Sequence, residues 1–508
     1  MHFLEHLLAE KQQGTHSRLG FLFDTEKHHY LFDAGTNKVA LIDEPLGYDF
    51  LRMYFDHSTS TDSILSFVEN HEGSDVLSLF LQQLESEHML QATKMQSMQL
   101  LAPGKTYEDQ VMHNLQQLTL EVTGRCNFRC KYCIYSEEYD GNRDFNSEDM
   151  TWDTARKAID LALAHSGDCV SITFYGGEPL LNYDLIKQSI DYSLLNRGDK
   201  EISYSFTSNL SLMTEEMAEY FASVPNLGVV ASIDGPQEMH DAFRVYANNR
   251  PTFKDTLRGL ERIAKAFKKT GNELMVNAVY TPPYSFEKSR KMDEFFRSLP
   301  YLEGAQIRVT YPSPGTLHNI EKLYEDGEDK IDSMFDHGNP LSKWAWETFL
   351  SGTKSSMAEQ YVLDRLQIAY FRVLLEHPTN RHHFNGCCVP GVRRLYVKTN
   401  GELALCERIG NSPSIGNVDD GVDIARVKQF YIDEYEKASL PDCANCWASN
   451  LCDLCYAHCY NDRGIDIAEK RTVCAYNRER IVTSLCMYHY LLEEHPERLE
   501  ILKDIVMT

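Results

Sequence analysis

The chain has 508 residues, enough for two to four domains, and its hydrophobic fraction of 43% and charged fraction of 25% are those of an ordinary globular protein. Lysine and arginine total 50 against 75 acidic residues, and this formal net charge of −25 argues against a general nucleic-acid-binding protein. The first residues lack the basic and apolar regions of a signal peptide, and no apolar run could cross a bilayer, so we expect a cytoplasmic protein without a membrane partner.

The first 95 residues combine predicted strands with predicted helices. Strands are expected at 20–23, 29–32 and 38–42, and helices at 63–69 and 75–89. Strands followed by helices make a small α+β module, which we expect to be winged-helix-like. Residues 96–114 are polar and without pattern, which is typical of a linker.

Residues 115–314 alternate predicted strands with helical patterns. Strands are expected at 118–122, 170–175, 202–207, 228–233, 274–280 and 306–310, with helices between them that include 152–165, 255–269 and 286–299. Repeated βα units imply a parallel sheet whose functional groups lie at the carboxyl ends of the strands. Five or six units predict an α/β fold with an incomplete barrel, a partial (β/α)6, and not a full eight-stranded one.

The remaining chain is predicted to consist of helices and a cysteine-rich region. Residues 315–384 carry a long helical pattern near 357–376 and would form a helical bridge, and residues 481–508 are expected to be a C-terminal helix. The segment 385–480 is dense in cysteine: of 14 cysteines in the chain, ten lie between Cys387 and Cys486. In a reducing compartment, such clusters bind metal more often than they form disulfides.

Three cysteines follow the first predicted barrel strand directly. Cys126, Cys130 and Cys133 form a CxxxCxxC loop. Three thiolates within eight residues can hold three irons of one [4Fe–4S] cube and leave the fourth iron open to a small chelating molecule. The alternative is a zinc knuckle that takes its fourth ligand from elsewhere in the chain.

This loop resembles the signature of the radical S-adenosylmethionine (SAM) superfamily, in which an aromatic residue precedes the third cysteine; Tyr132 occupies that position. Gly176, Gly177, Glu178 and Pro179, at the end of the second strand, match the superfamily's GGEP. The resemblance implies that the open iron binds S-adenosylmethionine. Reductive cleavage of that cofactor would then release a 5′-deoxyadenosyl radical, which abstracts a hydrogen atom from the substrate.

The resemblance also implies a cofactor pocket at the ends of the first strands. Glu178 would meet the methionine ammonium, Ser208 and Asn209 the ribose, and Ser232 with Arg244 the carboxylate of the cofactor. The expected pocket consists of Tyr132, Gly176, Gly177, Glu178, Pro179, Ser208, Asn209, Ser232, Asp234 and Arg244.

Two features of this pocket, a glycine pair and an aspartate, suggest a role on physical grounds. The paired glycines 176 and 177 let the backbone approach the cofactor closely. Asp234 either accepts a proton from the substrate or caps the helix that follows it.

The cysteine-rich region resembles the SPASM extension of the same superfamily, which binds one or two auxiliary [4Fe–4S] clusters. By family order, the outer cluster would be held by Cys443, Cys446, Cys452 and Cys474, and the inner one by Cys388, Cys406 and one of Cys455 or Cys459. The family places three residues after the third cysteine of this run, whereas Cys455 follows Cys452 after only two.

The fourth inner ligand stays open in the sequence. Adjacent Cys387 is a candidate, and the other hypothesis is a vacant position for a substrate thiolate. Zinc ribbons are the alternative explanation of the paired cysteines. Cys169 and Cys486 fit no pattern, and buried apolar packing would explain them.

A strand-and-helix module before such a barrel resembles the peptide-recognition elements of enzymes that mature ribosomally made peptides. An extended leader peptide would add a strand to the edge of the hairpin at residues 30–39. A packing or dimerisation domain is the alternative.

The resemblance therefore implies a peptide maturase with three [4Fe–4S] clusters, S-adenosylmethionine, a precursor peptide bound through its leader, and an electron donor such as flavodoxin or ferredoxin. The expected reaction joins a cysteine sulfur to an unactivated carbon in a thioether, as in ranthipeptide and sactipeptide maturases. Carbon–carbon crosslinking, formylglycine-type sulfatase maturation and epimerisation are the alternatives. Two hypotheses of another class are an iron–sulfur electron relay, which would need no cofactor pocket, and a zinc-stabilised binding scaffold.

Overall fold

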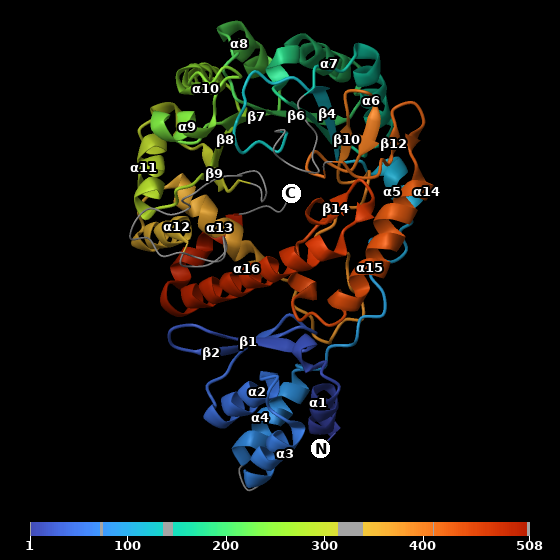
Figure 1. The fold of residues 1–508 in the computed structure, drawn as a ribbon, viewed down its shortest axis with the longest axis vertical. Helices are drawn as coiled ribbons and strands as arrows, with labels where there is room; N and C mark the ends of the chain where they lie inside the picture. The colour runs from blue at the N-terminus through green and yellow to red at the C-terminus, as the bar shows by residue number, and fades with distance from the viewer. Residues whose placement is uncertain (1, 72–74, 136–145, 313–338, 410, 505–508) are drawn as a thin grey trace.

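The computed structural model describes residues 2–71, 75–135, 146–312, 339–409 and 411–504 (Figure 1). The N-terminal module consists of α1 (His2–Gln12), β1 (Gly20–Asp24), β2 (His29–Asp33), β3 (Val39–Leu41), α2 (Pro45–Phe55), α3 (Thr61–Asn70) and α4 (Asp75–Ser86). The three predicted strands are confirmed, and they form an antiparallel sheet in the order β1-β2-β3. Helix α1, which precedes the strands, was not expected from the sequence.

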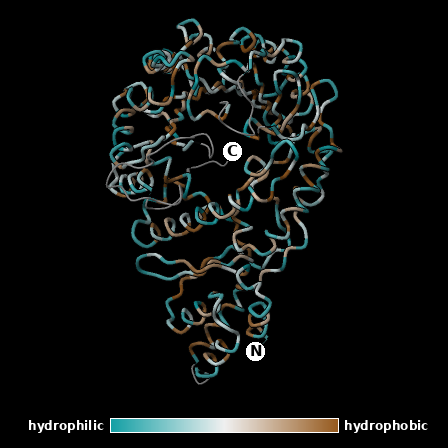
Figure 2. The backbone as a smooth tube through the Cα atoms, viewed as in Figure 1, coloured by the Kyte–Doolittle hydropathy of each residue, from teal (hydrophilic) through white to brown (hydrophobic). Residues whose placement is uncertain are grey.

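The module has its own small core and is also attached to the rest of the molecule. Phe23, Tyr30 and Phe32 of its sheet share a buried cluster with Ile481 and Leu485 of α16 (Ile467–Glu494). The sheet accordingly lies between its own helices and α16 in Figure 1. Figure 2 shows the middle of the β1–β2 hairpin as hydrophobic and its tip as hydrophilic. A continuous hydrophobic stretch is expected when both faces of a sheet are covered, and Leu31 lies in the module's own core while Phe32 lies in the shared cluster.

The predicted partial barrel is confirmed. Its parallel strands are β4 (Gln117–Thr123), β5 (Cys169–Gly176), β6 (Glu201–Ser208), β7 (Leu227–Ser232), β8 (Glu273–Val279) and β9 (Gln306–Thr310), adjacent in this order. The helices between them are α6 (Trp152–His165), α7 (Tyr183–Asn196), α8 (Glu215–Ser223), α9 (Gln237–Phe243), α10 (Phe253–Phe267) and α11 (Phe286–Arg297). Figure 1 shows these helices outside the arc of strands.

The alternation of residues along the strands explains this arrangement. In β5, Ile172 and Phe174 are fully buried in the main core, whereas Ser171 and Thr173, which alternate with them, pair with the hydroxyls of Ser203 and Ser205 in β6. Side chains of a strand alternate between its two faces, so one face of the sheet packs on helices and the other is polar. The polar face lines the inside of the barrel, since the helices cover the other face.

The barrel sheet continues into the cysteine-rich region, which the sequence did not indicate. Strand β10 (Leu395–Val397) pairs in parallel with β4, and β11 (Glu402–Ala404), β12 (Gly416–Asn417) and β13 (Gly421–Val422) extend the sheet in antiparallel fashion to ten strands. Cys406 therefore follows a strand that belongs to the same sheet as the strand before Cys126.

The other elements of the described chain are mainly helices. They are α5 (Tyr107–His113), α12 (Pro340–Ser351), α13 (Ser356–Tyr370), α14 (Ile424–Val427), a π-helical turn (Lys428–Asp433), α15 (Glu434–Cys443), the hairpin β14 (Tyr460–Asn461) and β15 (Gly464–Ile465), and the 3-10 helix η7 (Pro496–Asp504). Helix α5 interrupts the predicted linker, α13 ends before the predicted boundary at 376, and α16 begins at Ile467 instead of 481. Among the described residues, no helix combines the length and apolar character needed to span a bilayer.

Candidate functional site

The cysteine loop leaves the carboxyl end of β4 and is fixed by the segment that follows α9. The backbone N–H of Arg129 donates to the carbonyl of Val245 at 2.7 Å, and that of Lys131 donates to the carbonyl of Phe243 at 2.9 Å. The ring of Phe128 packs edge-on against Tyr246 with centroids 5.1 Å apart. These contacts give the three cysteines a defined position on a loop that has no regular secondary structure.

The thiols of the loop lie together and are partly exposed. Burial is the main cause that raises the pKa of all three thiols, to about 12 for Cys130. The pKa of Cys126 is raised further by Glu178 and by the charges of Cys130 and Cys133. Thiols grouped in this way suit a bound metal cluster, because cluster formation replaces their protons. Within the described ranges, no three His, Cys, Asp or Glu side chains are arranged to hold a single metal ion.

The glycine pair contacts the backbone at the base of this loop. Gly176 has a φ of +131°, and a Cβ atom there would lie 2.1 Å from the carbonyl oxygen of Thr123. A Cβ atom on Gly177 would lie 2.2 Å from the carbonyl oxygen of Arg125, to which Glu178 donates its N–H at 2.8 Å. The two glycines thus allow a close approach to the chain's own backbone beside Cys126, and the expected approach to the cofactor stays a prediction.

Glu178 joins the ends of two strands. Its carboxylate is 2% exposed and accepts hydrogen bonds from Ser208 Oγ at 2.7 Å, the Asn209 N–H at 2.9 Å and the Leu180 N–H at 3.1 Å. The Asn209 side chain in turn donates to Asn127 Oδ1 of the cysteine loop at 2.9 Å. Burial raises the pKa of Glu178, and the hydrogen bonds from Asn209 and Ser208 oppose that rise. Pro179 begins the short 3-10 turn that follows.

Asp234 and Arg244 form a buried ion pair beneath the cysteine loop. Arg244 Nε lies 3.0 Å from Asp234 Oδ2, and the two side chains are 8% and 1% exposed. The hydroxyl of Tyr132 donates to the same oxygen at 2.5 Å, and the Val279 N–H donates to Oδ1 at 3.0 Å. The guanidinium carbon of Arg244 is 5.4 Å from the centre of the Tyr132 ring. Arg244 also lowers the pKa of Cys130, against the larger effect of burial.

The prediction that Asp234 caps the following helix is wrong. Pro236 is the N-terminal cap residue of α9, without a side-chain hydrogen bond. Both oxygens of Asp234 are instead bound by groups far away in the sequence, which local capping patterns do not reveal. Ser232 ends β7 close by and is 8% exposed.

His240 is a member of this region to which the sequence gave no role. Its Nδ1 accepts the Asp234 N–H at 3.4 Å, its Nε2 lies 3.0 Å from Thr252 Oγ1, and the residue is fully buried. Burial lowers the pKa of His240 to about 4, so the imidazole is neutral at pH 7. It supports the backbone of Asp234 and thereby the ion pair.

The second group of cysteines surrounds a cavity of about 330 Å³. Cys443, Cys446, Cys452 and Cys474, the four expected ligands of an outer cluster, all line it. They come from the end of α15, the loop after it and the second turn of α16. The Asn477 side chain donates to Cys452 Sγ at 3.3 Å, and Lys470 Nζ donates to Cys443 Sγ at 3.7 Å. Four cysteines around one cavity fit the donor set of a [4Fe–4S] cluster.

The remaining cysteines lie nearer the barrel. Burial is the largest cause that raises the pKa of Cys387, Cys406 and Cys455. The charge of Cys455 also raises the pKa of Cys387 and of Cys406. The charge of Cys388 in turn raises the pKa of Cys455. Cys455 therefore has Cys387, Cys388 and Cys406 as neighbours. Cys459 is only 3% exposed and points its Sγ towards the carbonyl of Cys455 at 3.7 Å.

The two unassigned cysteines behave differently from each other. Cys169 is exposed at the start of β5, so the expectation of buried packing is wrong for it. Cys486 packs beside the shared cluster of the module and α16, and its Sγ lies 3.6 Å from the carbonyl of Asp24.

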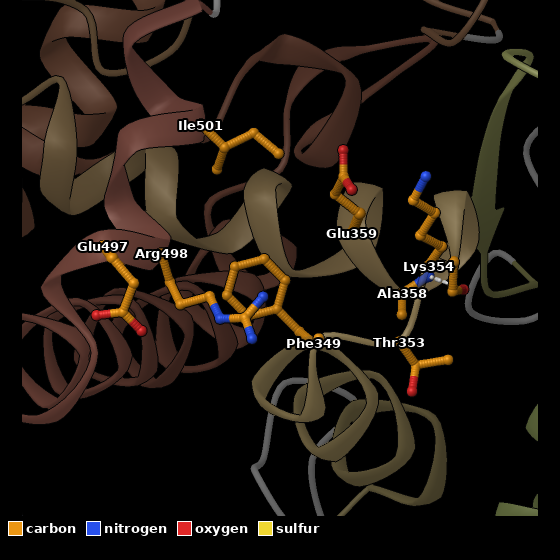
Figure 3. A pocket seen from close by; sticks show the side chains of 10 residues that line it. Phe349, Thr353, Lys354, Ala358, Glu359, Glu497, Arg498 and Ile501 are labelled. Carbon is orange, nitrogen blue, oxygen red and sulfur yellow. Dashed lines mark hydrogen bonds between the residues drawn. The ribbon is translucent and has the colours of Figure 1, made fainter.

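A second cavity, of about 260 Å³, lies between α12, α13 and η7 and contains none of the predicted site residues. Figure 3 shows Arg498 beside Phe349 on one side of it and Lys354 with Glu359 on the other. The guanidinium carbon of Arg498 is 5.9 Å from the centre of the Phe349 ring. The mixed charges select no ligand class.

The fold and the site define an open parallel α/β barrel with a three-cysteine loop at the carboxyl end of its first strand. Residues 120–296 match the Radical SAM superfamily, a segment that runs from β4 to α11. This part of the chain is therefore a radical SAM enzyme domain, of the superfamily whose members bind a [4Fe–4S] cluster and S-adenosylmethionine.

Relatives align over different parts of the chain. An uncharacterised protein, MJ0907 of Methanocaldococcus jannaschii, is 38% identical over 30% of this chain, and the chain spans about half the length of that relative (49%). The radical SAM cyclopropyl synthase TigE of Paramaledivibacter caminithermalis is 25% identical over 78% of both chains. A cysteine-type anaerobic sulfatase-maturating enzyme of Clostridium novyi is 24% identical over 69% of this chain and 89% of its own.

The fold also matches a solved structure. Native anSMEcpe with bound AdoMet and the Cp18Cys peptide superposes with a TM-score of 0.53 at 19% identity, over 77% of this chain and all of the other (100%). At that identity the match establishes a common fold.

Proposed function

We propose that the protein is a radical SAM peptide maturase that modifies a ribosomally made precursor peptide. The observation that carries this proposal is the presence of two cysteine sites in one chain: a three-cysteine loop at the carboxyl end of β4, and a four-cysteine cavity formed by the end of α15, the loop after it and α16. The relatedness to TigE and to a sulfatase-maturating enzyme supports a reaction on a protein or peptide substrate.

The residues of the first site would bind and orient the cofactors. Cys126, Cys130 and Cys133 would hold a [4Fe–4S] cluster, which supplies the electron that cleaves S-adenosylmethionine to a 5′-deoxyadenosyl radical. Arg244, fixed by Asp234, places a positive charge where the cofactor carboxylate would bind. Ser208 and Asn209, which are bonded to Glu178, would lie beside the ribose of the cofactor.

The second and third cysteine groups would hold two auxiliary clusters. Cys443, Cys446, Cys452 and Cys474 would bind the outer one in their common cavity. For the inner one we propose Cys388, Cys406 and Cys455, because Cys455 shares electrostatic contacts with both other thiols. Cys387 would be the fourth ligand, or the fourth coordination position of the cluster would stay open for a substrate thiolate. An open coordination position that binds a substrate thiolate would favour thioether formation as the reaction.

The N-terminal module would bind the leader of the precursor at its free edge. Within the part of the chain that the structure describes, strand β3 pairs only with β2, and Leu41 at its end is 46% exposed. The Ile42 N–H is bonded to His29 of β2, so by the alternation of strands the Leu41 N–H faces outwards. Leu41→Pro should therefore weaken binding of a candidate precursor without disturbing the β2–β3 pairing, which fluorescence anisotropy with a labelled peptide would measure.

The first test counts iron and sulfide per chain after anaerobic reconstitution. About twelve irons, falling to about eight when Cys126, Cys130 and Cys133 are replaced by alanine, would support three clusters. The same triple variant is the control for cofactor cleavage. If the natural protein releases no more 5′-deoxyadenosine than this variant, or contains zinc in place of iron, the proposal is wrong.

Carbon–carbon bond formation is the second candidate, because the relatedness to a cyclopropyl synthase extends over 78% of both chains. Both reactions remove two hydrogens from the peptide, so mass alone does not separate them. Alkylation does: a thioether product has lost a cysteine thiol and resists iodoacetamide, whereas a carbon–carbon product keeps every thiol. Formylglycine formation would instead convert a side chain to an aldehyde, which hydrazide reagents trap.

A further inference from the structure

Lys470 is a buried cation beside the four-cysteine cavity. Its side chain is only 3% exposed, and it lines the cavity together with Cys474 and Asn477. Its polar contact is with Cys443 Sγ at 3.7 Å, and its Nζ also lies 4.5 Å from the centre of the Tyr435 ring. Among the described residues, no carboxylate lies within ion-pair distance of this ammonium.

Such an arrangement lacks a counter-charge. Removing an ammonium from water is costly unless an anion and hydrogen-bond acceptors compensate for it. A thiol is a weak acceptor and an aromatic ring offers only a cation–π contact. A [4Fe–4S] cluster held by four thiolates is an anion and would lie in the cavity that Lys470 lines.

Three side chains of helix α16 line that cavity. Lys470, Cys474 and Asn477 are spaced i, i+4 and i+7, which places them on one face of the helix. One residue supplies a ligand, one a positive charge and one an N–H donor to Cys452 Sγ. Lys470 also opposes the effect of burial on the pKa of Cys443, Cys459 and Cys474, so its charge acts on several thiols at once.

We propose that Lys470 is the counter-ion of the outer auxiliary cluster and raises the reduction potential of that cluster. The inference rests on the proposed presence of this cluster. One electron that enters the cluster adds one negative charge, and a nearby buried cation stabilises the reduced form more than the oxidised form. Lys470 would thus set how readily the outer cluster accepts an electron, without being a ligand itself.

The test is a redox titration, followed by electron paramagnetic resonance, of the full chain with Cys126, Cys130 and Cys133 replaced by alanine, so that only auxiliary clusters contribute. Lys470→Met keeps the aliphatic stem and removes the charge. We expect its outer cluster to be harder to reduce by about tenfold or more in the equilibrium constant, which is about 59 mV for one electron. Lys470→Arg keeps the positive charge, so the reduction potential of its outer cluster should lie close to that of the parent chain.

Arg471→Met is the matched control. It removes the same unit charge from the next residue of α16, but Arg471 is 62% exposed and paired with Asp442 at 2.8 Å. Water and salt screen such a charge, so the shift should be much smaller. Equal shifts for the two variants, or none for Lys470→Met, would overturn the assignment of Lys470 while leaving the cluster in place.

Iron counts separate the remaining outcomes. If Lys470→Met loses about four irons and Lys470→Arg keeps them, the charge is needed to hold the cluster and the inference stands. Loss in both variants would mean that the shape of the lysine matters instead of its charge, and would refute the inference. If the parent chain holds no iron, the proposed outer cluster itself is wrong.

Discussion

Gly177 leaves no room for a side chain beside the cysteine loop, because a Cβ atom there would lie 2.2 Å from the carbonyl oxygen of Arg125 and 3.0 Å from the N atom of Cys126. We predict that Gly177→Ala displaces the loop and that the reconstituted protein loses about four irons. Gly271→Ala is the control, since no atom lies within 4 Å of a Cβ at that position. Unchanged iron content and cofactor cleavage in Gly177→Ala would contradict the role given to this contact.

The Asp234–Arg244 pair is the second residue-scale feature that can be measured. Removing one partner of a buried ion pair costs about 3–5 kcal/mol, because the other charge is left without compensation. We predict that Asp234→Asn lowers the free energy of unfolding by about 3 kcal/mol in urea titrations. Asp153→Asn, at an exposed pair with Lys157, should change it by less than about 1 kcal/mol. Similar losses in both variants would show that burial adds nothing to this pair.

The sequence predicted which residues lie at the site better than it predicted the contacts that each of them makes. The three loop cysteines, Glu178 and Asp234 follow strands, and strand ends of a parallel sheet meet at one edge, so their proximity could be predicted. The partners of Asp234 come from Tyr132, Arg244 and Val279. These positions are distant in the sequence, and local helix-capping chemistry was therefore a misleading guide.

At the scale of elements, His489 on α16 joins the N-terminal module to the rest of the chain. Its ring centroid lies 5.2 Å from that of Phe23 and 4.8 Å from that of Tyr30, and its Nδ1 donates to the carbonyl of Leu485 at 2.8 Å. Burial lowers the pKa of His489 to about 4; Arg372 lowers it too, and Glu493 raises it.

Because the folded pKa lies below the ordinary value of about 6.5, the unfolded or undocked state binds the proton more readily. The stability due to neutral His489 is complete above pH 6.5 and is lost as the pH falls towards 4. We predict a loss of about 2 kcal/mol at pH 5, seen as faster hydrogen exchange in β1 and β2 after correction for intrinsic rates. His489→Phe should remove this pH dependence; if it persists in that variant, another group is responsible.

Elements with strong local patterns were predictable and those defined by tertiary contacts were not. Strand β9 and helix α6 have the predicted bounds, because alternating or helically spaced apolar residues mark them without help from the rest of the chain. Strand β10 has three residues and exists through its pairing with β4. No pattern in three residues identifies a partner strand that is so distant in the sequence, so the ten-stranded sheet could not be foreseen.

At the scale of the whole molecule, the module and the outer cysteine cavity share a packing interface. Phe21 of β1 stacks on Trp447, the residue next to Cys446, with ring centroids 4.5 Å apart, and Phe32 contacts the same indole at 5.9 Å. Phe32 is fully buried. The loop that carries Cys446 is therefore held from below by the sheet of the N-terminal module.

We predict that Phe32→Ala costs about 3–5 kcal/mol of unfolding free energy and also slows or prevents reconstitution of the outer cluster. The first part follows from the cavity left in a closed core, and the second from the loss of support under Trp447. Phe50→Ala, in the separate core of the module, is the control, since it should cost similar stability and leave the iron content unchanged. Equal iron content in the two variants would argue against a structural link.

Helix α16 has 28 residues and is about 42 Å long. It contacts the cavity of the outer cysteines through Lys470 and Cys474. It also contacts the sheet of the module through Ile481 and Leu485. Because α16 contacts both sites, binding of a leader to the module and reduction of the outer cluster can be treated as two equilibria of one thermodynamic cycle. If occupancy of the module by a leader changes the ease of reducing the cluster by some factor, reduction must change the affinity for the leader by that same factor. Measuring leader binding in the oxidised and the reduced protein would therefore yield the coupling free energy without any assay of product.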